Sequence, residues 1–242
     1  MEKATKSDID NSDCDIDLIE IDEELSLSIS NLLPGDVLLF RSLRGDKLAK
    51  KIAQATNSPY THAALYLGDG EIVESNPPNI QVRQLTKSDC AATQIGVLRS
   101  QMTFQNSRVA AVTEFVNRLI STKARYDYQG VVKFKGRNAD FHENIISEIQ
   151  KNYGVSANND DAARKNYFCS ALVVACYTAS GIIGVTAEVL YPPNIFSPGD
   201  LHRDPTFGWF LGYLYPKNSE VPSDDPLLDC TLWRDNSEAR WW

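Results

Sequence analysis

One cysteine of this 242-residue chain stands where a nucleophile could be activated. Cys169 lies at the start of residues 168–180, FCSALVVACYTAS, whose nearly continuous apolar character predicts a buried helix. Thiols attack carbonyls as thiolates, and the partial positive charge at a helix N-terminus lowers the pKa of a thiol. The free N–H groups of the same turn can hold the oxyanion of a tetrahedral intermediate. The pattern therefore predicts Cys169 as a nucleophile.

A histidine has to accept the thiol proton near neutral pH, and the chain contains three. His142 lies in a polar stretch and His202 lies in a turn, whereas His62 begins an apolar run that ends at a Gly-Asp-Gly turn. Another apolar run follows this turn, so residues 62–74 are predicted to form a β-hairpin. A strand of the core would fix the position of the imidazole, and we therefore predict His62 as the general base.

Glu74 is the candidate for the group that orients this imidazole. It lies on the second strand of the hairpin, in a register that places it beside or diagonal to His62. On the same face of the sheet, its carboxylate can accept the second ring N–H and stabilise the imidazolium. Spacing alone leaves simpler alternatives open: Cys169 as a small core residue, His62 as a structural histidine and Glu74 as a charge at a strand end.

Hydrophobic patterning predicts the elements that surround these residues. The expected strands are residues 37–40, 80–85 and 95–99, and the expected helices are residues 46–56 and 107–122. Residues 136–166 are polar, with a helical stretch near 141–151, and are predicted to form an insertion or a lid.

Composition divides the chain into three parts: an acidic tail over residues 1–30, a folded domain over 31–215 and a polar C-terminal extension over 216–242. Residues 1–25 carry ten acidic and two basic side chains, which accounts for the whole net charge of −8. The remainder is neutral, so no bulk attraction to nucleic acid is expected. An acidic segment of this composition is predicted to stay mobile.

Composition also limits the compartment and the cofactors. No apolar run approaches the length of a membrane span, and no signal-peptide pattern opens the chain. We therefore expect a cytoplasmic protein, or one exported by a route that needs no cleavable signal. Five cysteines without a CxxC pair indicate reduced thiols. Together with three scattered histidines they offer no ligand cluster, so no metal and no cofactor are expected.

Several short motifs, in this order along the chain, resemble the circularly permuted papain-like hydrolases of the NlpC superfamily, in the YiiX/YebB-like branch. In that group the histidine precedes the cysteine, as His62 precedes Cys169 here. Singly these motifs are weak, but their number and order extend the resemblance over most of the folded chain. The motifs are PGDVLLF (34–40), SPYTH (58–62), HAALYLGDGEIVE (62–74), YDY (126–128), FCSALV (168–173) and SPGDL (197–201).

The resemblance implies an α+β, papain-like fold over residues 31–215, with a central antiparallel sheet or barrel packed on the helix that carries Cys169. It implies Cys169, His62 and Glu74 as the catalytic triad. The related lecithin–retinol acyltransferases carry a second histidine at the place of Glu74 and a different nucleophile motif, which favours the hydrolase branch. Ala171 departs from the glutamate that is usual in the branch two residues after the cysteine.

Three functions follow from these residues. The first is hydrolysis of amide bonds in peptides or peptidoglycan stem peptides through an acyl-enzyme, either on a cytoplasmic substrate or as an exported antibacterial effector with an immunity or export partner. The second is a lipid-directed amidase, thioesterase or acyltransferase acting on acyl-amides, for which the aromatic-rich residues 196–215 could line an acyl pocket. The third is a binding module in which the triad is idle.

Overall fold

The computed structural model describes residues 17–42, 47–155, 159–163 and 165–233. Its strands are β1 (Leu18–Glu20), β2 (Ser26–Leu27), β3 (Val37–Ser42), β4 (Tyr60–Gly68), β5 (Glu71–Asn76), β6 (Asn79–Gln84), β7 (Thr93–Arg99), β8 (Trp209–Leu214) and β9 (Glu220–Pro222). Its α-helices are α1 (Lys47–Thr56), α2 (Lys87–Ala92), α3 (Asn106–Ser121), α4 (Tyr128–Glu143), α5 (Ile145–Asn152), α6 (Asn159–Ala162), α7 (Cys169–Ala179) and α8 (Pro198–Leu201). Short 3-10 turns are η1 (Glu23–Leu25), η2 (Ile29–Asn31), η3 (Glu188–Leu190), η4 (Pro193–Ile195), η5 (Lys217–Ser219) and η6 (Pro226–Asp229).

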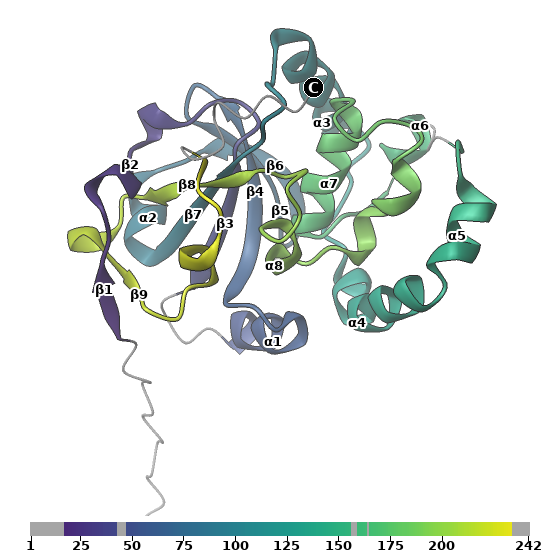
Figure 1. The fold of residues 1–242 in the computed structure, drawn as a ribbon. Coiled ribbons are helices and arrows are strands. Elements are labelled where there is room, and N and C mark those ends of the chain that lie inside the picture. Colours follow the sequence, from purple (N-terminus) through teal and green to yellow (C-terminus); the bar gives the residue numbers. More distant parts are fainter. Residues whose placement is uncertain (1–16, 43–46, 156–158, 164, 234–242) are drawn as a thin grey trace, which may run out of the picture.

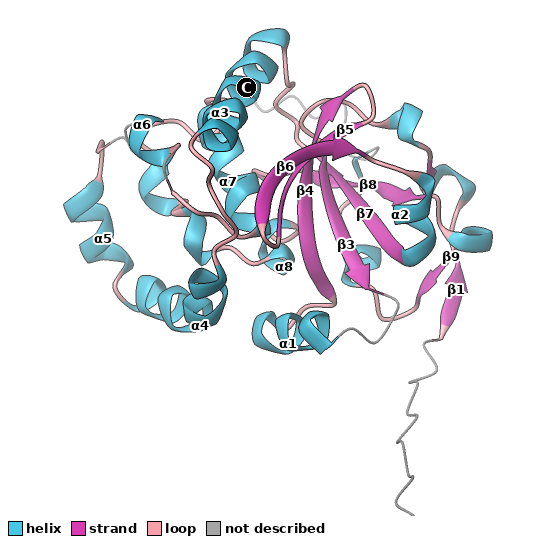
Figure 2. Cartoon of the chain, turned by 180° about the vertical axis from the view of Figure 1, so that it is seen from behind, coloured by secondary structure: helices cyan, strands magenta, loops and turns pink. Residues whose placement is uncertain are grey.

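Seven strands form one sheet in the order β2-β8-β7-β3-β4-β5-β6 (Figure 2). Neighbouring strands are antiparallel except β2, which runs parallel to β8. The sheet stays open, with β2 and β6 at its two edges. The predicted α+β fold is therefore confirmed with a sheet at its centre, and a barrel is not formed because the two edge strands do not pair.

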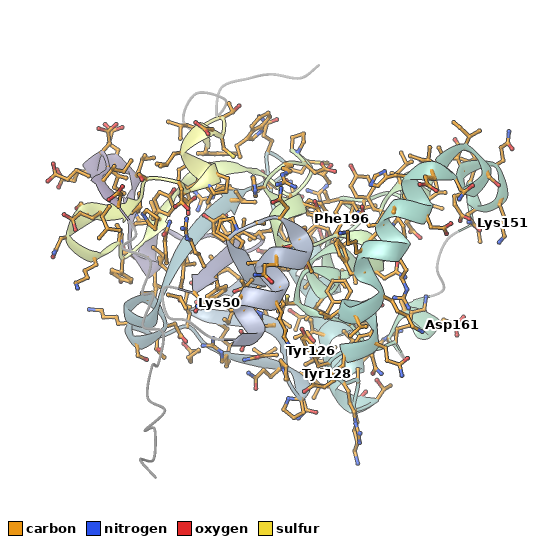
Figure 3. The ribbon with its side chains drawn as sticks, turned by 90° about the horizontal axis from the view of Figure 1, so that it is seen from below. Lys50, Tyr126, Tyr128, Lys151, Asp161 and Phe196 are labelled. Atoms are coloured by element: carbon orange, nitrogen blue, oxygen red, sulfur yellow. The ribbon has the colours of Figure 1, made fainter. Side chains whose placement is uncertain are left out.

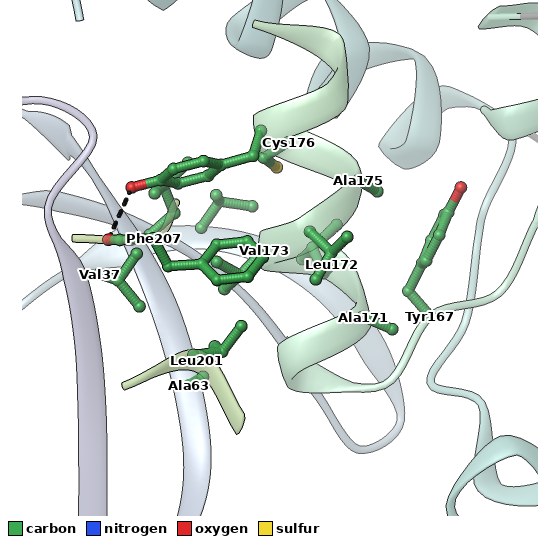
Figure 4. Packing of buried hydrophobic residues seen from close by; sticks show 14 of the residues in the cluster. Val37, Ala63, Tyr167, Ala171, Leu172, Val173, Ala175, Cys176, Leu201 and Phe207 are labelled. Carbon is green, nitrogen blue, oxygen red and sulfur yellow. Dashed lines mark hydrogen bonds between the residues drawn. The ribbon is translucent and has the colours of Figure 1, made fainter. Parts of the chain in front are cut away.

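Alternating side chains divide the sheet between two hydrophobic cores. The larger core packs one face of the sheet against α7 and α3, and it includes Val37, Ala63 and Leu172. A smaller core on the opposite face includes Leu38 and Ala64, each next in sequence to a residue of the larger one. Figure 4 shows α7 as the centre of the larger core, with the helix buried on all sides as its apolar sequence predicts.

Helices α4, α5 and α6 lie beside α7 on the side away from the sheet (Figures 1 and 2). The predicted insertion over residues 136–166 is thus mostly helical, and its first helix already begins at Tyr128 rather than near residue 141. The polar sequence concealed this earlier start because only three residues of α4 are buried. No helix in the described ranges is long and apolar enough to cross a membrane.

The two ends of the described chain join the fold instead of leaving it. Strand β1 pairs with β9, and β2 extends the main sheet, so the predicted tail over residues 1–30 does not hold from residue 17 onward. Its first sixteen residues lie outside the described ranges. The segment after residue 216 is also packed: Leu227 is fully buried in the larger core, against Gly96 of β7. A side chain at Gly96 would meet Leu227, which explains a glycine inside a central strand.

Candidate active site

Cys169 is the first residue of α7, at the position that its sequence context predicts. Phe168 precedes it in extended conformation, and the first backbone bond of the helix runs from the N–H of Leu172 to the carbonyl of Phe168. The N–H groups of residues 169–171 therefore have no acceptor within the helix and point toward its N-terminal side. The side chain is nearly buried, with 5% of the residue exposed.

His62 and Glu74 meet on one face of the sheet. The β4–β5 register pairs Ala64 with Glu74, so Glu74 lies diagonally from His62 rather than directly opposite it. Nε2 of His62 lies 2.9 Å from Oε2 of Glu74. The Glu74 side chain is only 1% exposed, whereas that of His62 is 23% exposed. The buried carboxylate thus engages one ring nitrogen and leaves the other, Nδ1, available.

Each of the three side chains His62, Glu74 and Cys169 has a pKa that is shifted toward its charged form. Burial lowers the pKa of His62, but hydrogen bonds and charge from Cys169 and Glu74 outweigh it and raise that pKa from 6.5 to about 9. Burial raises the pKa of Glu74, but His62 and two further donors outweigh it and lower that pKa from 4.5 to about 2. A protonated imidazole beside an ionised carboxylate is the arrangement that stabilises a thiolate.

Cys169 differs in this respect from the other described cysteines. Burial raises the pKa of its thiol, but the hydrogen bond and charge of His62, with backbone N–H groups of Ala63 and Ser170, lower it below the ordinary value. Burial raises the pKa of Cys176 well above that value, and Cys176 lies on the same helix. Burial likewise raises the pKa of Cys90 to about 11. Burial also raises the pKa of Cys230. The fold thus favours ionisation at Cys169 and disfavours it at the other three described thiols.

A small pocket of about 30 Å³ opens onto Cys169 between α1 and α4. Figure 3 looks onto this side of the molecule, with Tyr126 and Tyr128 at one end of the space between the two helices and Phe196 at the other. The walls of the pocket are largely apolar and belong to Ile52, Ala55, Val131, Phe134 and Phe168. A group held there would lie next to the sulfur, and the volume suits a group of about the size of a methyl.

A second cavity, of about 880 Å³, lies on the other side of Phe168, between α7 and helices α4 and α5. Its floor includes Ala171 and Ala175 of α7, and its rim carries charged side chains such as Arg137 and Glu148. The short side chain of Ala171 leaves room on this side of the helix. Phe168 lines both cavities and packs edge to face against Phe134, which lines the smaller one.

Two residues that the sequence did not single out complete the surroundings of Glu74. Gln81 lies opposite Glu74 in the β5–β6 register, and Arg83 lies two residues further along the same face. Both donate hydrogen bonds to the carboxylate. Their alternation on a predicted strand beside the hairpin was the signal that could have identified them. Within the described ranges, no three His, Cys, Asp or Glu side chains are grouped as metal ligands would be.

Most of this chain is similar in sequence to known proteins. Residues 31–204 match the family model described as "Permuted papain-like amidase enzyme, YaeF/YiiX, C92 family". The chain is 25% identical over 168 residues to a protein of Escherichia coli (strain K12) named "Probable lipoprotein peptidase YaeF", which covers 64% of this chain and 58% of that relative. The chain therefore spans less than two thirds of the relative's length. The match extends over most of the chain, and this protein belongs to the family of permuted papain-like amidases.

Proposed function

We propose that Cys169, His62 and Glu74 form the catalytic triad of an amide hydrolase. The observation that carries this proposal is the position of the His62 ring, which contacts the thiol of Cys169 and the buried carboxylate of Glu74. Each alternative that the sequence left open assigns a separate structural role to each residue. None of them accounts for one imidazole that joins a thiol of lowered pKa to a buried acid.

The reaction follows the positions of these groups. The proton of Cys169 passes to Nδ1 of His62, and the thiolate attacks the amide carbonyl. Free N–H groups in the first turn of α7 hold the oxyanion. Collapse of the intermediate breaks the C–N bond, and the imidazolium gives its proton to the departing amine. Water, deprotonated by His62, then releases the acyl group and restores the thiol.

The size of the pocket at Cys169 supports a peptide as the substrate. A space of about 30 Å³ between α1 and α4 accommodates a small side chain beside the scissile carbonyl. Short side chains of that size occur in ordinary peptides and in the stem peptides of peptidoglycan. The relative from Escherichia coli is named as a peptidase, in agreement with this substrate class.

A lipid-directed reaction is the second candidate, and the larger cavity is the observation that favours it. Phe168 lines both cavities, so a rotation of this ring would connect the sulfur with about 880 Å³ of partly apolar space. A space of that size falls in the range of ligand pockets. The substrate would then be an acyl-amide whose chain passes Phe168.

One experiment separates these functions. The purified protein is incubated with peptidoglycan sacculi, with peptides and with long-chain acyl-amides, and the released products are identified by mass spectrometry. We expect cleavage of peptide substrates that is lost in Cys169→Ala. Cleavage of acyl-amides alone would favour the second candidate, and unchanged cleavage in Cys169→Ala would contradict the mechanism.

A matched control is available on the same helix. Cys176→Ala removes a thiol that is fully buried and has a raised pKa, so it should retain activity. Labelling by iodoacetamide near neutral pH should select Cys169 over Cys90 and Cys176 in the folded protein, because alkylation requires the thiolate. Equal labelling of these three thiols would contradict the proposed activation of Cys169.

A further inference from the structure

The Glu74 carboxylate is held on both of its oxygens. Oε1 accepts hydrogen bonds from Nε of Arg83 at 2.7 Å and from Nε2 of Gln81 at 2.9 Å. Oε2 lies 2.9 Å from Nε2 of His62 and accepts a longer bond from Nη2 of Arg83 at 3.3 Å. Arg83 is the residue that reaches both oxygens, so it restricts rotation of the carboxylate about its terminal bond.

Arg83 is itself fixed on its other side. Its Nη1 donates to Oδ2 of Asp89 at 2.9 Å and to the carbonyl of Gln84 at 3.1 Å. Asp89 belongs to the capping box of α2, where Thr86 donates its backbone N–H to the same carboxylate at 2.8 Å. The guanidinium is therefore tied to a helix terminus, and its planar fork is oriented before it meets Glu74.

We propose that Arg83 is a positioning residue of the active site: it holds the Glu74 carboxylate in the orientation that meets His62, and Asp89 holds Arg83. This inference rests on the proposed roles of His62 and Glu74. A chain of contacts thus runs from α2 through β6 and β5 to the imidazole on β4. Gln81 cannot replace Arg83, because Gln81 contacts a single carboxylate oxygen and carries no charge.

Charge gives Arg83 a second effect on the same site. The titratable groups in contact along this chain are His62 on β4, Cys169 on α7, Arg83 on β6 and Asp89 on α2. With Arg83 present, the ionised Glu74 is balanced by two cations when His62 is protonated. Loss of Arg83 would leave one cation, and a buried carboxylate with fewer partners binds protons more readily.

The test follows alkylation of Cys169 by iodoacetamide as a function of pH in the folded, full-length protein. Arg83→Met should move the acidic limb of the profile up by about half a pH unit or more. His62 is protonated over that range, so removal of a further cation disfavours the thiolate. Arg83→Lys keeps the charge and should therefore return most of the profile to that of the wild type. Arg118→Met, which breaks an exposed pair with Glu114 on α3, is the matched control and should leave the profile unchanged.

A spectroscopic readout tests the positioning role itself. The Nε2 proton of His62, bonded to a buried carboxylate, should give a resonance that is protected from solvent exchange. Arg83→Met and, to a smaller extent, Arg83→Lys should lose this protection. If Arg83→Met does not fold, Asp89→Asn serves in its place and should weaken the protection while Glu74 keeps its donors.

The outcomes separate this inference from the proposed function. Retention of both the protected resonance and the wild-type profile in Arg83→Met, or in Asp89→Asn where that variant replaces it, would overturn the inference and leave the triad in place. A wild-type Cys169 that shows no thiolate below the ordinary thiol range would overturn the proposed function, and the positioning role of Arg83 with it.

Discussion

Two substitutions separate the contributions of Cys169 and Glu74 to the pKa of His62. Its pKa rises from 6.5 to about 9, a net preference for the imidazolium of about 3 kcal/mol. Burial acts in the opposite direction, so Cys169 and Glu74 together contribute more than this net amount. Cys169→Ala and Glu74→Gln should each lower the pKa of His62 from about 9. The double variant retains burial without either partner, and its His62 pKa should fall below 6.5.

The assay is a histidine NMR titration of the four proteins in the cycle. The chain contains three histidines, so the ring signals can be assigned by substitution. His202, which follows α8, is the internal control and should titrate alike in all four proteins. A double variant whose His62 remains protonated above pH 8 would refute the reasoning, because a group other than Cys169 and Glu74 would then hold the charge.

Three further predictions concern stability, measured by urea denaturation. Asp225→Ala should cost about 3 kcal/mol, because Asp225 is buried, pairs with the buried guanidinium of Arg41 and accepts further hydrogen bonds there. Leu227→Ala should cost about 2 to 5 kcal/mol, because the side chain is fully buried. The lowered pKa of Glu74 implies stability that is present above pH 4.5 and is lost as the pH falls toward 2. The advantage of the wild type over Glu74→Gln should therefore shrink by up to about 3 kcal/mol over that range.

Each of these predictions has a comparison on the same molecule. Asp224 also pairs with Arg41, but its side chain is 70% exposed, so Asp224→Ala should cost less than about 1 kcal/mol. Leu33 is 55% exposed, and Leu33→Ala should have a similarly small effect. Equal losses of stability in Asp225→Ala and Asp224→Ala would contradict the stabilising role of the buried pair between Asp225 and Arg41. A constant difference between the wild type and Glu74→Gln from pH 5 to 2 would contradict the lowered pKa.

The elements around the site could be predicted because their signals are local. The Gly-Asp-Gly turn predicts the β4–β5 hairpin, and the structure places the strands within two residues of the predicted ends. The apolar run after Phe168 predicts α7 and places Cys169 at its first turn. Two-residue periodicity then limits Glu74 to a position beside or diagonal to His62, and the register is diagonal.

The tertiary structure decided what depends on contacts between distant segments. Nothing near residues 18–27 in the sequence indicates that they pair with strands some two hundred residues later, so an acidic segment was expected to be a tail. The burial of Leu227 over Gly96 is likewise a contact between residues far apart in the chain. The sheet stays open because its edge strands do not meet, which no local pattern reports. The sequence by itself determined the fold family and indicated the residues that we propose for the chemistry. The partners that hold Glu74 depend on strand register, and only the structure gives them.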